Sequence, residues 1–181
     1  AADFDDDGWP DVLLVSHISG RDDTLPATIY WGNPQHAYGS ASATQLDVNP
    51  HMEYSCADLD DDGFPDLVFL SGPAKRPMVL WGSATGFARE NRTDLTVADP
   101  WSSSIADLNR DGELDIFFVC KEGPPNALRL QGAIVWGDGR RCSESLVTEF
   151  EVGPGGNEAN SIADLNRDGH LDLIVAGVGS P

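Results

Sequence analysis

The chain has 181 residues, of which 40% are hydrophobic, and its 30 acidic and 11 basic residues give a formal net charge of −19. The hydrophobic content argues against a disordered polymer, and the negative charge excludes nucleic acid as an expected partner, since its phosphates would be repelled. No apolar run approaches the ~20 residues that a membrane-spanning helix needs, so we expect no membrane span.

The first element of the chain is an acid-rich loop at 2–11, and the same ten-residue pattern returns at 57–66, 106–115 and 163–172. Each copy reads Ala-Asp-(Phe/Leu)-(Asp/Asn)-x-Asp-Gly-x-x-Asp, and we number these copies loops one to four. Their first aspartates lie 55, 49 and 57 residues apart. A period of this length is typical of a propeller blade or a solenoid unit.

The residues between successive loops also repeat, and their patterns predict strands. After loop one comes an apolar run at 12–15, then Ile-Tyr-Trp-Gly at 29–32, an alternating segment at 44–48, and a short segment at 52–56 just before loop two. Apolar runs suit a strand buried on both faces, and alternation suits an outer strand. The corresponding segments of later periods are 67–70, 79–82, 93–97, 102–105, 116–119, 134–137, 146–152 and 171–176.

Four strands per period, here labelled A to D, predict an all-β fold: a β-propeller of four-stranded antiparallel blades. We expect a fragment of about three to three and a half blades within one propeller domain. Residues 1–49 form blade 1 with an incomplete strand A, 50–98 form blade 2, 99–157 form blade 3, and 158–181 start blade 4. Propellers usually close with four to eight blades, so we expect the rest of the ring from a longer chain.

The loops have the chemistry of a calcium site. Oxygen ligands at positions 1, 3 and 5 can converge on a hard cation, Gly at position 6 permits the turn, and a carbonyl at 7 and a carboxylate at 9 complete the shell. We predict up to four Ca²⁺ ions, one per loop. The predicted ligands are Asp3, Asp5, Asp7, Trp9 (carbonyl) and Asp11; Asp58, Asp60, Asp62, Phe64 (carbonyl) and Asp66; Asp107, Asn109, Asp111, Glu113 (carbonyl) and Asp115; and Asp164, Asn166, Asp168, His170 (carbonyl) and Asp172.

Two other interpretations of the loops are open. An EF-hand needs a bidentate Glu at position 12 between two helices, but that position holds Leu14, Phe69, Phe118 and Val175, so this interpretation fails. The second interpretation is a set of metal-free hairpin turns rich in Asp and Gly. The presence of four copies in register argues against this interpretation. Loops one and two offer four carboxylates each and should bind more tightly than loops three and four, which offer three and an Asn.

The Asp-x-Asp-x-Asp-Gly-x-x-Asp loop in a period of this length resembles the FG-GAP/VCBS repeat family, whose relatives include the N-terminal propeller of integrin α-chains. The resemblance covers nearly the whole chain, with the Trp-Gly strand as a supporting signal. It implies metal hairpins that join strands A and B on one face of the ring, and partners bound on the opposite face. It also implies structural calcium in an extracellular protein, either secreted, periplasmic or at the cell surface.

The opposite face would carry a protein or glycan partner. We expect it to hold the B–C loops and the D–A loops, and its candidate contacts are Lys75, Arg76, Lys121 and Trp101. A basic, partly aromatic face over an acidic body suits an anionic or glycan ligand. Ordinary surface charge is the alternative. The expected B–C loops lie near 18–26, 72–76 and 121–130.

These features favour a binding, adhesion or scaffold module over an enzyme. The sequence has no Gly-x-Ser-x-Gly elbow and no phosphate-binding glycine loop, and the loop carboxylates are committed to metal, so we assign no catalytic residue. The alternative is part of a carbohydrate-active enzyme, similar to a propeller polysaccharide lyase, whose catalytic residues lie mostly outside this chain.

Overall fold

The computed structural model describes residues 1–15, 26–35, 37–48, 51–71, 76–122, 129–142, 146–154 and 156–178. These residues form β-strands, loops and one short 3-10 turn, η1 (Ser40–Ser42). In this part of the chain no helix is long and apolar enough to cross a membrane. The strands are β1 (Val12–Leu14), β2 (Thr28–Tyr30), β3 (Ala43–Gln45), β4 (His51–Ala57), β5 (Asp66–Ser71), β6 (Met78–Leu80), β7 (Arg92–Asp94), β8 (Pro100–Ala106), β9 (Asp115–Glu122), β10 (Arg129–Val135), β11 (Val147–Pro154), β12 (Gly156–Ala163) and β13 (Asp172–Val178).

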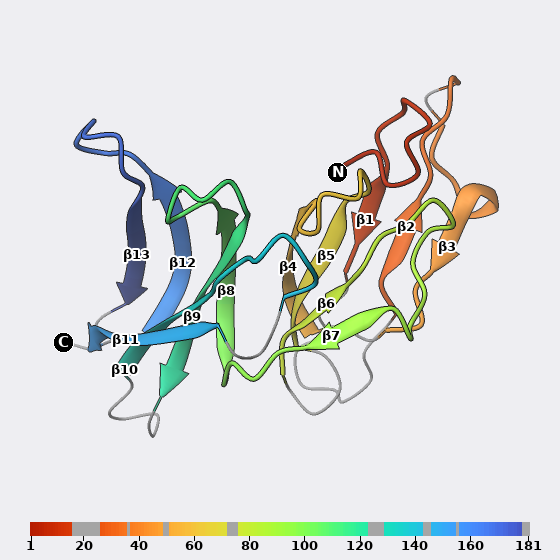
Figure 1. The fold of residues 1–181 in the computed structure, drawn as a ribbon. Coiled ribbons are helices and arrows are strands. Elements are labelled where there is room, and N and C mark those ends of the chain that lie inside the picture. Colours follow the sequence, from red (N-terminus) through yellow and green to blue (C-terminus); the bar gives the residue numbers. More distant parts are fainter. Residues whose placement is uncertain are drawn as a thin grey trace.

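The strands form four antiparallel sheets that follow chain order (Figure 1): β1-β2-β3, β4-β5-β6-β7, β8-β9-β10-β11 and β12-β13. An isolated bridge between Ala2 and Asp11 precedes the first sheet. This confirms the predicted all-β fold of repeated antiparallel units. In the fourth sheet, β12 already begins at Gly156, before the expected blade start at 158.

In the first two repeats, strand D is shorter than its alternating sequence predicts, whereas β11 of the third repeat runs to Pro154, beyond the predicted end at 152. Strands β3 and β7 end at Gln45 and Asp94, although alternation continues to 48 and 97. Beyond those ends the backbone still bonds to the neighbouring segment, since Leu95 N–H donates to the Pro77 carbonyl at 2.8 Å. The chain therefore leaves the regular ladder while it keeps its backbone hydrogen bonds.

Strand B supplies the core on both of its faces, which explains its unbroken apolar sequence. In β5, Val68 and Leu70 face the third sheet, whereas Leu67 and Phe69 face the first. All four side chains are fully buried. Successive residues of a strand point to opposite faces, so a strand between two neighbouring sheets must be apolar at every position.

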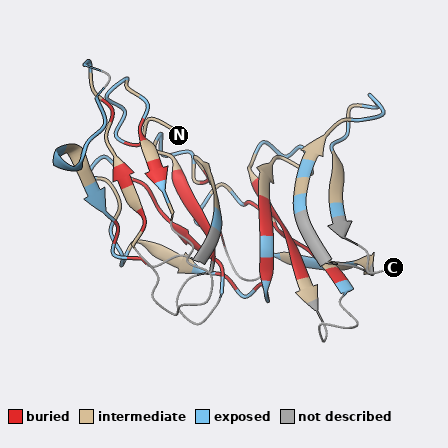
Figure 2. Ribbon diagram, turned by 180° about the vertical axis from the view of Figure 1, so that it is seen from behind, coloured by how far each residue is buried: buried red, intermediate tan, exposed pale blue. Residues whose placement is uncertain are grey.

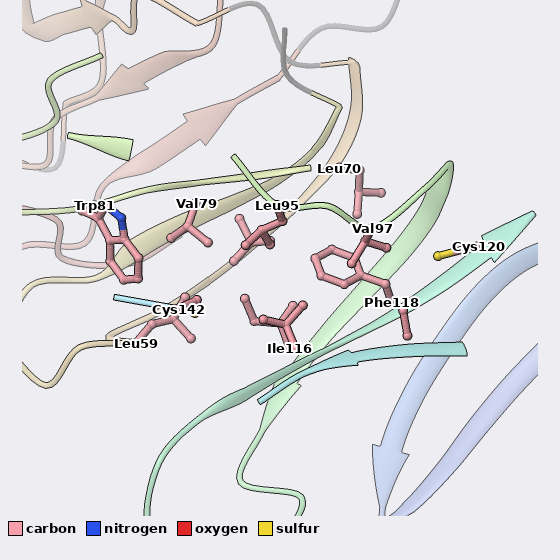
Figure 3. Packing of buried hydrophobic residues seen from close by; sticks show 13 residues of the cluster. Leu59, Leu70, Val79, Trp81, Leu95, Val97, Ile116, Phe118, Cys120 and Cys142 are labelled. Atoms are coloured by element: carbon pink, nitrogen blue, oxygen red, sulfur yellow. The ribbon is translucent and has the colours of Figure 1, made fainter. Parts of the chain in front are cut away.

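The buried residues form three clusters, each between two neighbouring sheets. In Figure 2 the buried positions, drawn in red, lie on strands of the first three sheets and on adjoining loops. The cluster between the second and third sheets is shown in Figure 3 and includes the fully buried Trp81. The indole N–H of this tryptophan donates to Thr93 on strand D at 3.0 Å. Trp31 and Trp136 make the same bond to Thr44 and Thr148, at 2.8 Å each.

Neighbouring A strands meet through small polar side chains. The hydroxyl groups of Ser55 on β4 and Ser103 on β8 lie 2.6 Å apart. Asn160 on β12 donates to the Ser102 hydroxyl at 2.6 Å and accepts from Ser104. Small side chains let these strands approach closely, and the hydrogen bonds satisfy polar groups that the approach buries.

Candidate metal centres

All four acid-rich loops join strand A to strand B or, in the first repeat, precede strand B, and they lie along the upper edge of the sheets in Figure 1. The backbone of loop two shows why the motif has its spacing. The Asp58 carboxylate accepts the N–H groups of Asp62 at 3.1 Å and Gly63 at 2.9 Å, and the Asp62 carboxylate accepts the Phe64 N–H at 2.9 Å. Loops one, three and four repeat these bonds.

Two residues in each loop adopt left-handed backbone angles. The glycine at position 6, such as Gly63 with φ of 93°, was expected from the turn chemistry. Position 4 is also left-handed, at Asp6, Asp61, Arg110 and Arg167. Asp tolerates this conformation better than Arg, because its short side chain can bond locally. Loops three and four therefore fold with more backbone strain than loops one and two.

The aspartate at position 9 is a buried anchor for the loop. Asp66 is fully buried, and its two oxygens accept the N–H of Leu59 and the N–H of Gly82, each at 2.8 Å. One carboxylate thus ties the start of loop two to the end of strand C. Asp11 and Asp115 make the same pair of bonds, and Asp172 accepts the N–H of Leu165.

The Trp-Gly pair on strand C belongs to the site, although its sequence pattern predicts only a repeated strand. A Cβ atom on Gly82 would lie 2.5 Å from the Pro65 carbonyl oxygen, and Gly32 and Gly137 meet the same obstacle from Pro10 and Leu114. Only glycine lets strand C approach closely enough to donate its N–H to the anchor aspartate. The recurrence of Trp-Gly in register with the loops was the signal for this role.

Gly82→Ala is therefore expected to lower the free energy of unfolding by about 1–3 kcal/mol, the usual cost of overpacking a buried site. The added methyl group meets backbone, which cannot rotate away as a side chain can. Gly39→Ala is the matched control, since nothing lies within 4 Å of a Cβ there and its φ of −160° is extended. Chemical denaturation of both variants tests the prediction, and equal stabilities would contradict it.

Two loops bring three carboxylates within reach of one ion. Oxygen atoms of Asp3, Asp5 and Asp11 lie within 4.8 Å of one another, and so do those of Asp58, Asp60 and Asp66. These are positions 1, 3 and 9 of loops one and two. Crowding of like charges at such distances is unfavourable unless a cation lies among them.

The Asp60 side chain is the strongest indication that loop two binds a cation. Its Oδ1 atom is buried and has no hydrogen-bond partner among the described residues, while Oδ2 lies 3.5 Å from the Arg141 Nε atom. A buried carboxylate oxygen without a partner is costly. A hard cation in loop two would satisfy it, so the residues fit a calcium ion.

The other predicted ligands lie in the loops at the positions that the repeat gives them. The position-5 aspartates Asp7 and Asp62 are exposed, and they are not among the three carboxylates that lie close together in each of these loops.

In loops three and four the Asn side chain bonds within the loop: Asn109 Nδ2 donates to Asp111 Oδ2 at 2.8 Å, and Asn166 Nδ2 donates to Asp168 Oδ2 at 3.0 Å. In these two loops, the amide group of the asparagine therefore partly offsets the negative charge of the aspartate at position 5. The remaining predicted ligands are the backbone carbonyl groups at position 7 of the loops, in Trp9, Phe64, Glu113 and His170.

The ionisation of the anchor aspartate should make stability depend on pH. Burial, with smaller contributions from Asp60 and Asp62, raises the pKa of Asp66 from 3.8 to about 6, although its two backbone hydrogen bonds act in the opposite direction. The pKa values of Asp5 and Asp115 are also raised, chiefly by burial. The folded state then holds protons more tightly than the unfolded chain, so this stabilisation is full below about pH 4 and is lost as pH rises through 6.

Calcium-free protein is therefore expected to lose stability between pH 4 and pH 7, and Asp66→Asn should reduce that loss. Calcium affinity should rise over the same range, because the ion binds the ionised carboxylate. Thermal unfolding in calcium-free buffer at several pH values measures the first effect. Stability that rises with pH in the wild type, and equally in Asp66→Asn, would contradict the assignment.

Three of the candidate partner residues are described and lie at the other end of the sheets, and two of these belong to strands. Trp101 is on β8 and Lys121 is on β9, whereas the sequence predicts loops at both positions. The Lys121 Nζ atom lies 3.0 Å from the centre of the Trp101 ring. Strands β9 and β10 extend into the segment 121–130 that the sequence predicts as a loop, since β10 already begins at Arg129. Arg76 is exposed, and Lys75 lies outside the described residues.

Comparison with known proteins agrees with this architecture. A family model described as FG-GAP-like repeat matches residues 3–69 and 58–118. The two matches overlap, and together they span loop one from Asp3, all of loops two and three, and the first half of β9. No curated protein and no solved structure matches the chain significantly. Since the matched region covers well over half of the 181 residues, the chain belongs to the FG-GAP-like repeat family.

Proposed function

We propose that this chain is a calcium-stabilised propeller segment that works as a binding, adhesion or scaffold module. The observation that carries the proposal is the buried, unpartnered Oδ1 atom of Asp60 beside Asp58 and Asp66. Loop one repeats this arrangement of carboxylates. A bound calcium ion neutralises the crowded carboxylates and cross-links the loop.

The protein's own residues set how each loop would hold its ion. In loop two, positions 1 and 5 fold the loop through backbone hydrogen bonds, position 3 offers a buried oxygen without a described hydrogen-bond partner, and position 9 fixes the loop to strand C. In loops three and four, the position-3 Asn oxygen accepts the N–H of the position-5 aspartate. Loops three and four offer Asn109 and Asn166 in place of a third-position carboxylate. Up to four ions can bind, and the ions in loops one and two are held more tightly.

A partner-binding role is supported at the end of the sheets away from the loops. A cavity of about 410 Å³ there is lined by residues of the third sheet and by Ala98. Its lining combines the charged Lys121 and Glu149 with the polar Gln131. Such mixed surfaces suit a glycan or an extended protein segment. The millimolar calcium found outside cells matches a structural calcium site, which supports an extracellular location.

Glycan-array binding and polysaccharide digestion, run on the calcium-loaded chain, separate this proposal from an enzymatic role. The expected result is retention of a glycan or protein ligand without cleavage, weakened by Lys121→Gln. Arg89→Gln is the control, since Arg89 of the second repeat forms an exposed ion pair with Asp47 of the first repeat. Cleavage of a polysaccharide would instead support the carbohydrate-active alternative.

A further inference from the structure

Each of the first two acid-rich loops is covered by the C–D loop of the following repeat. At the first junction, Phe87 packs on Phe4 of loop one, with ring centroids 5.7 Å apart and nearly perpendicular planes. At the second junction, Cys142 joins Leu59 of loop two in the same core cluster (Figure 3). Phe87 and Cys142 occupy the same place in the repeat, six residues after the Trp of strand C.

The residue just before this contact differs between the two junctions. The first junction has Gly86, whereas the second has Arg141. The Arg141 Nε atom lies 3.5 Å from Oδ2 of Asp60, a position-3 carboxylate of loop two. A cation from the third repeat thus reaches a predicted calcium ligand of the second repeat, and glycine cannot make such a contact at loop one.

Arg141 is held in this place by other groups of the second repeat. Its Nη1 atom donates to Oδ1 of Asn91, whose own Nδ2 donates to the Trp81 carbonyl at 3.2 Å. Its guanidinium carbon lies 5.4 Å from the centre of the Trp81 ring, within the range of a cation–π interaction. The contact with Asp60 is therefore one of three that fix the side chain at the junction.

We propose that Arg141 competes with calcium for loop two, so that loop two binds calcium more weakly than loop one. The inference rests on the proposed calcium function. The two loops have the same side-chain ligands, aspartate at positions 1, 3, 5 and 9. Among the described residues, the carboxylates of loop two have an ion pair with an arginine and those of loop one have none. Calcium must approach a carboxylate that is already paired with a cation, and the guanidinium also repels the ion.

The size of the effect follows from the geometry. The Arg141 side chain is 47% exposed and its distance to Asp60 is long for an ion pair, so solvent screens the interaction. Exposed pairs of this kind change an equilibrium by roughly two- to five-fold. By reciprocity, calcium in loop two weakens the hold of Arg141 on Asp60 by the same factor, which couples ion occupancy to the junction of the second and third repeats.

Calorimetric calcium titration of the whole chain tests the competition. Asp5→Ala weakens loop one and leaves loop two as the tightest site. In this background, Arg141→Gln is expected to raise the calcium affinity of loop two by about two- to five-fold, while Arg141→Lys retains most of the wild-type affinity because it keeps the charge. Arg140→Gln removes the same charge from an exposed neighbouring residue and should have a smaller effect.

A double-mutant cycle with Asp60→Asn, which keeps a neutral oxygen ligand in loop two, localises the effect. In the Asp60→Asn background, Arg141→Gln should raise calcium affinity clearly less than it does beside the carboxylate, since the ion pair is gone and only the repulsion between the guanidinium and the ion remains. An unchanged or lower affinity in Arg141→Gln, or an equal rise in Arg140→Gln, would overturn the inference. A wild-type chain that binds no calcium would overturn the proposed function as well, so the two failures are distinguishable.

Discussion

Asp66→Ala is expected to lower the free energy of unfolding by about 2–6 kcal/mol, because each buried N–H group left without an acceptor costs about 1–3 kcal/mol. The two donors are the N–H groups of Leu59 and Gly82, both 2.8 Å from the carboxylate. The substitution also removes a calcium ligand, so stabilisation by added calcium should fall. Urea denaturation with and without calcium measures both effects.

Two further variants separate the anchor role from a general effect of charge. Asp66→Asn keeps one acceptor oxygen and should be intermediate in stability. Asp47→Ala removes a carboxylate whose only described ion pair, with Arg89, is largely exposed, so it should cost less than about 1 kcal/mol. If Asp66→Ala were as stable as Asp47→Ala, the anchor role would be wrong.

Removal of calcium is expected to lower the melting temperature strongly. An ion present at 100 times its dissociation constant stabilises a folded protein by about 2.7 kcal/mol per site, and the two carboxylate triads offer two such sites. Relief of the repulsion between the crowded carboxylates is part of this binding free energy. Thermal unfolding in millimolar calcium and in chelator measures the shift.

Magnesium is the matched control for this experiment. It demands regular octahedral geometry and gives up its water reluctantly, so it should restore little of the melting temperature. Asp5→Ala and Asp60→Ala should each reduce the calcium-dependent shift, and together they should remove most of it. Equal rescue by both metals would point to screening of the net charge of −19 rather than to specific sites.

The repeated strands and loops could be predicted from the sequence because they rest on local patterns. Apolar runs such as 67–70 indicate a strand buried on both faces, and β5 has neighbouring sheets on both sides. The acid spacing predicts ligand sets, and the structure gathers positions 1, 3 and 9 of loops one and two. Periodicity carries this information without any knowledge of long-range contacts.

The parts that could not be predicted depend on how distant segments meet. Nothing local to Gly82 indicates that its N–H bonds to Asp66 or that a Pro65 carbonyl blocks a side chain there. The approach of Arg141 to Asp60 likewise joins residues of two repeats. Strand ends were also missed, as at Trp101 on β8, because pairing with a neighbouring strand sets where a strand stops.

Calorimetric titration of calcium into the metal-free wild-type chain tests the central claim most directly. We predict saturable binding at two classes of site, the tighter class lost when Asp5 and Asp60 are both replaced by alanine. The absence of saturable binding, or binding that these two substitutions leave unchanged, would contradict the assignment of the acid-rich loops as calcium sites.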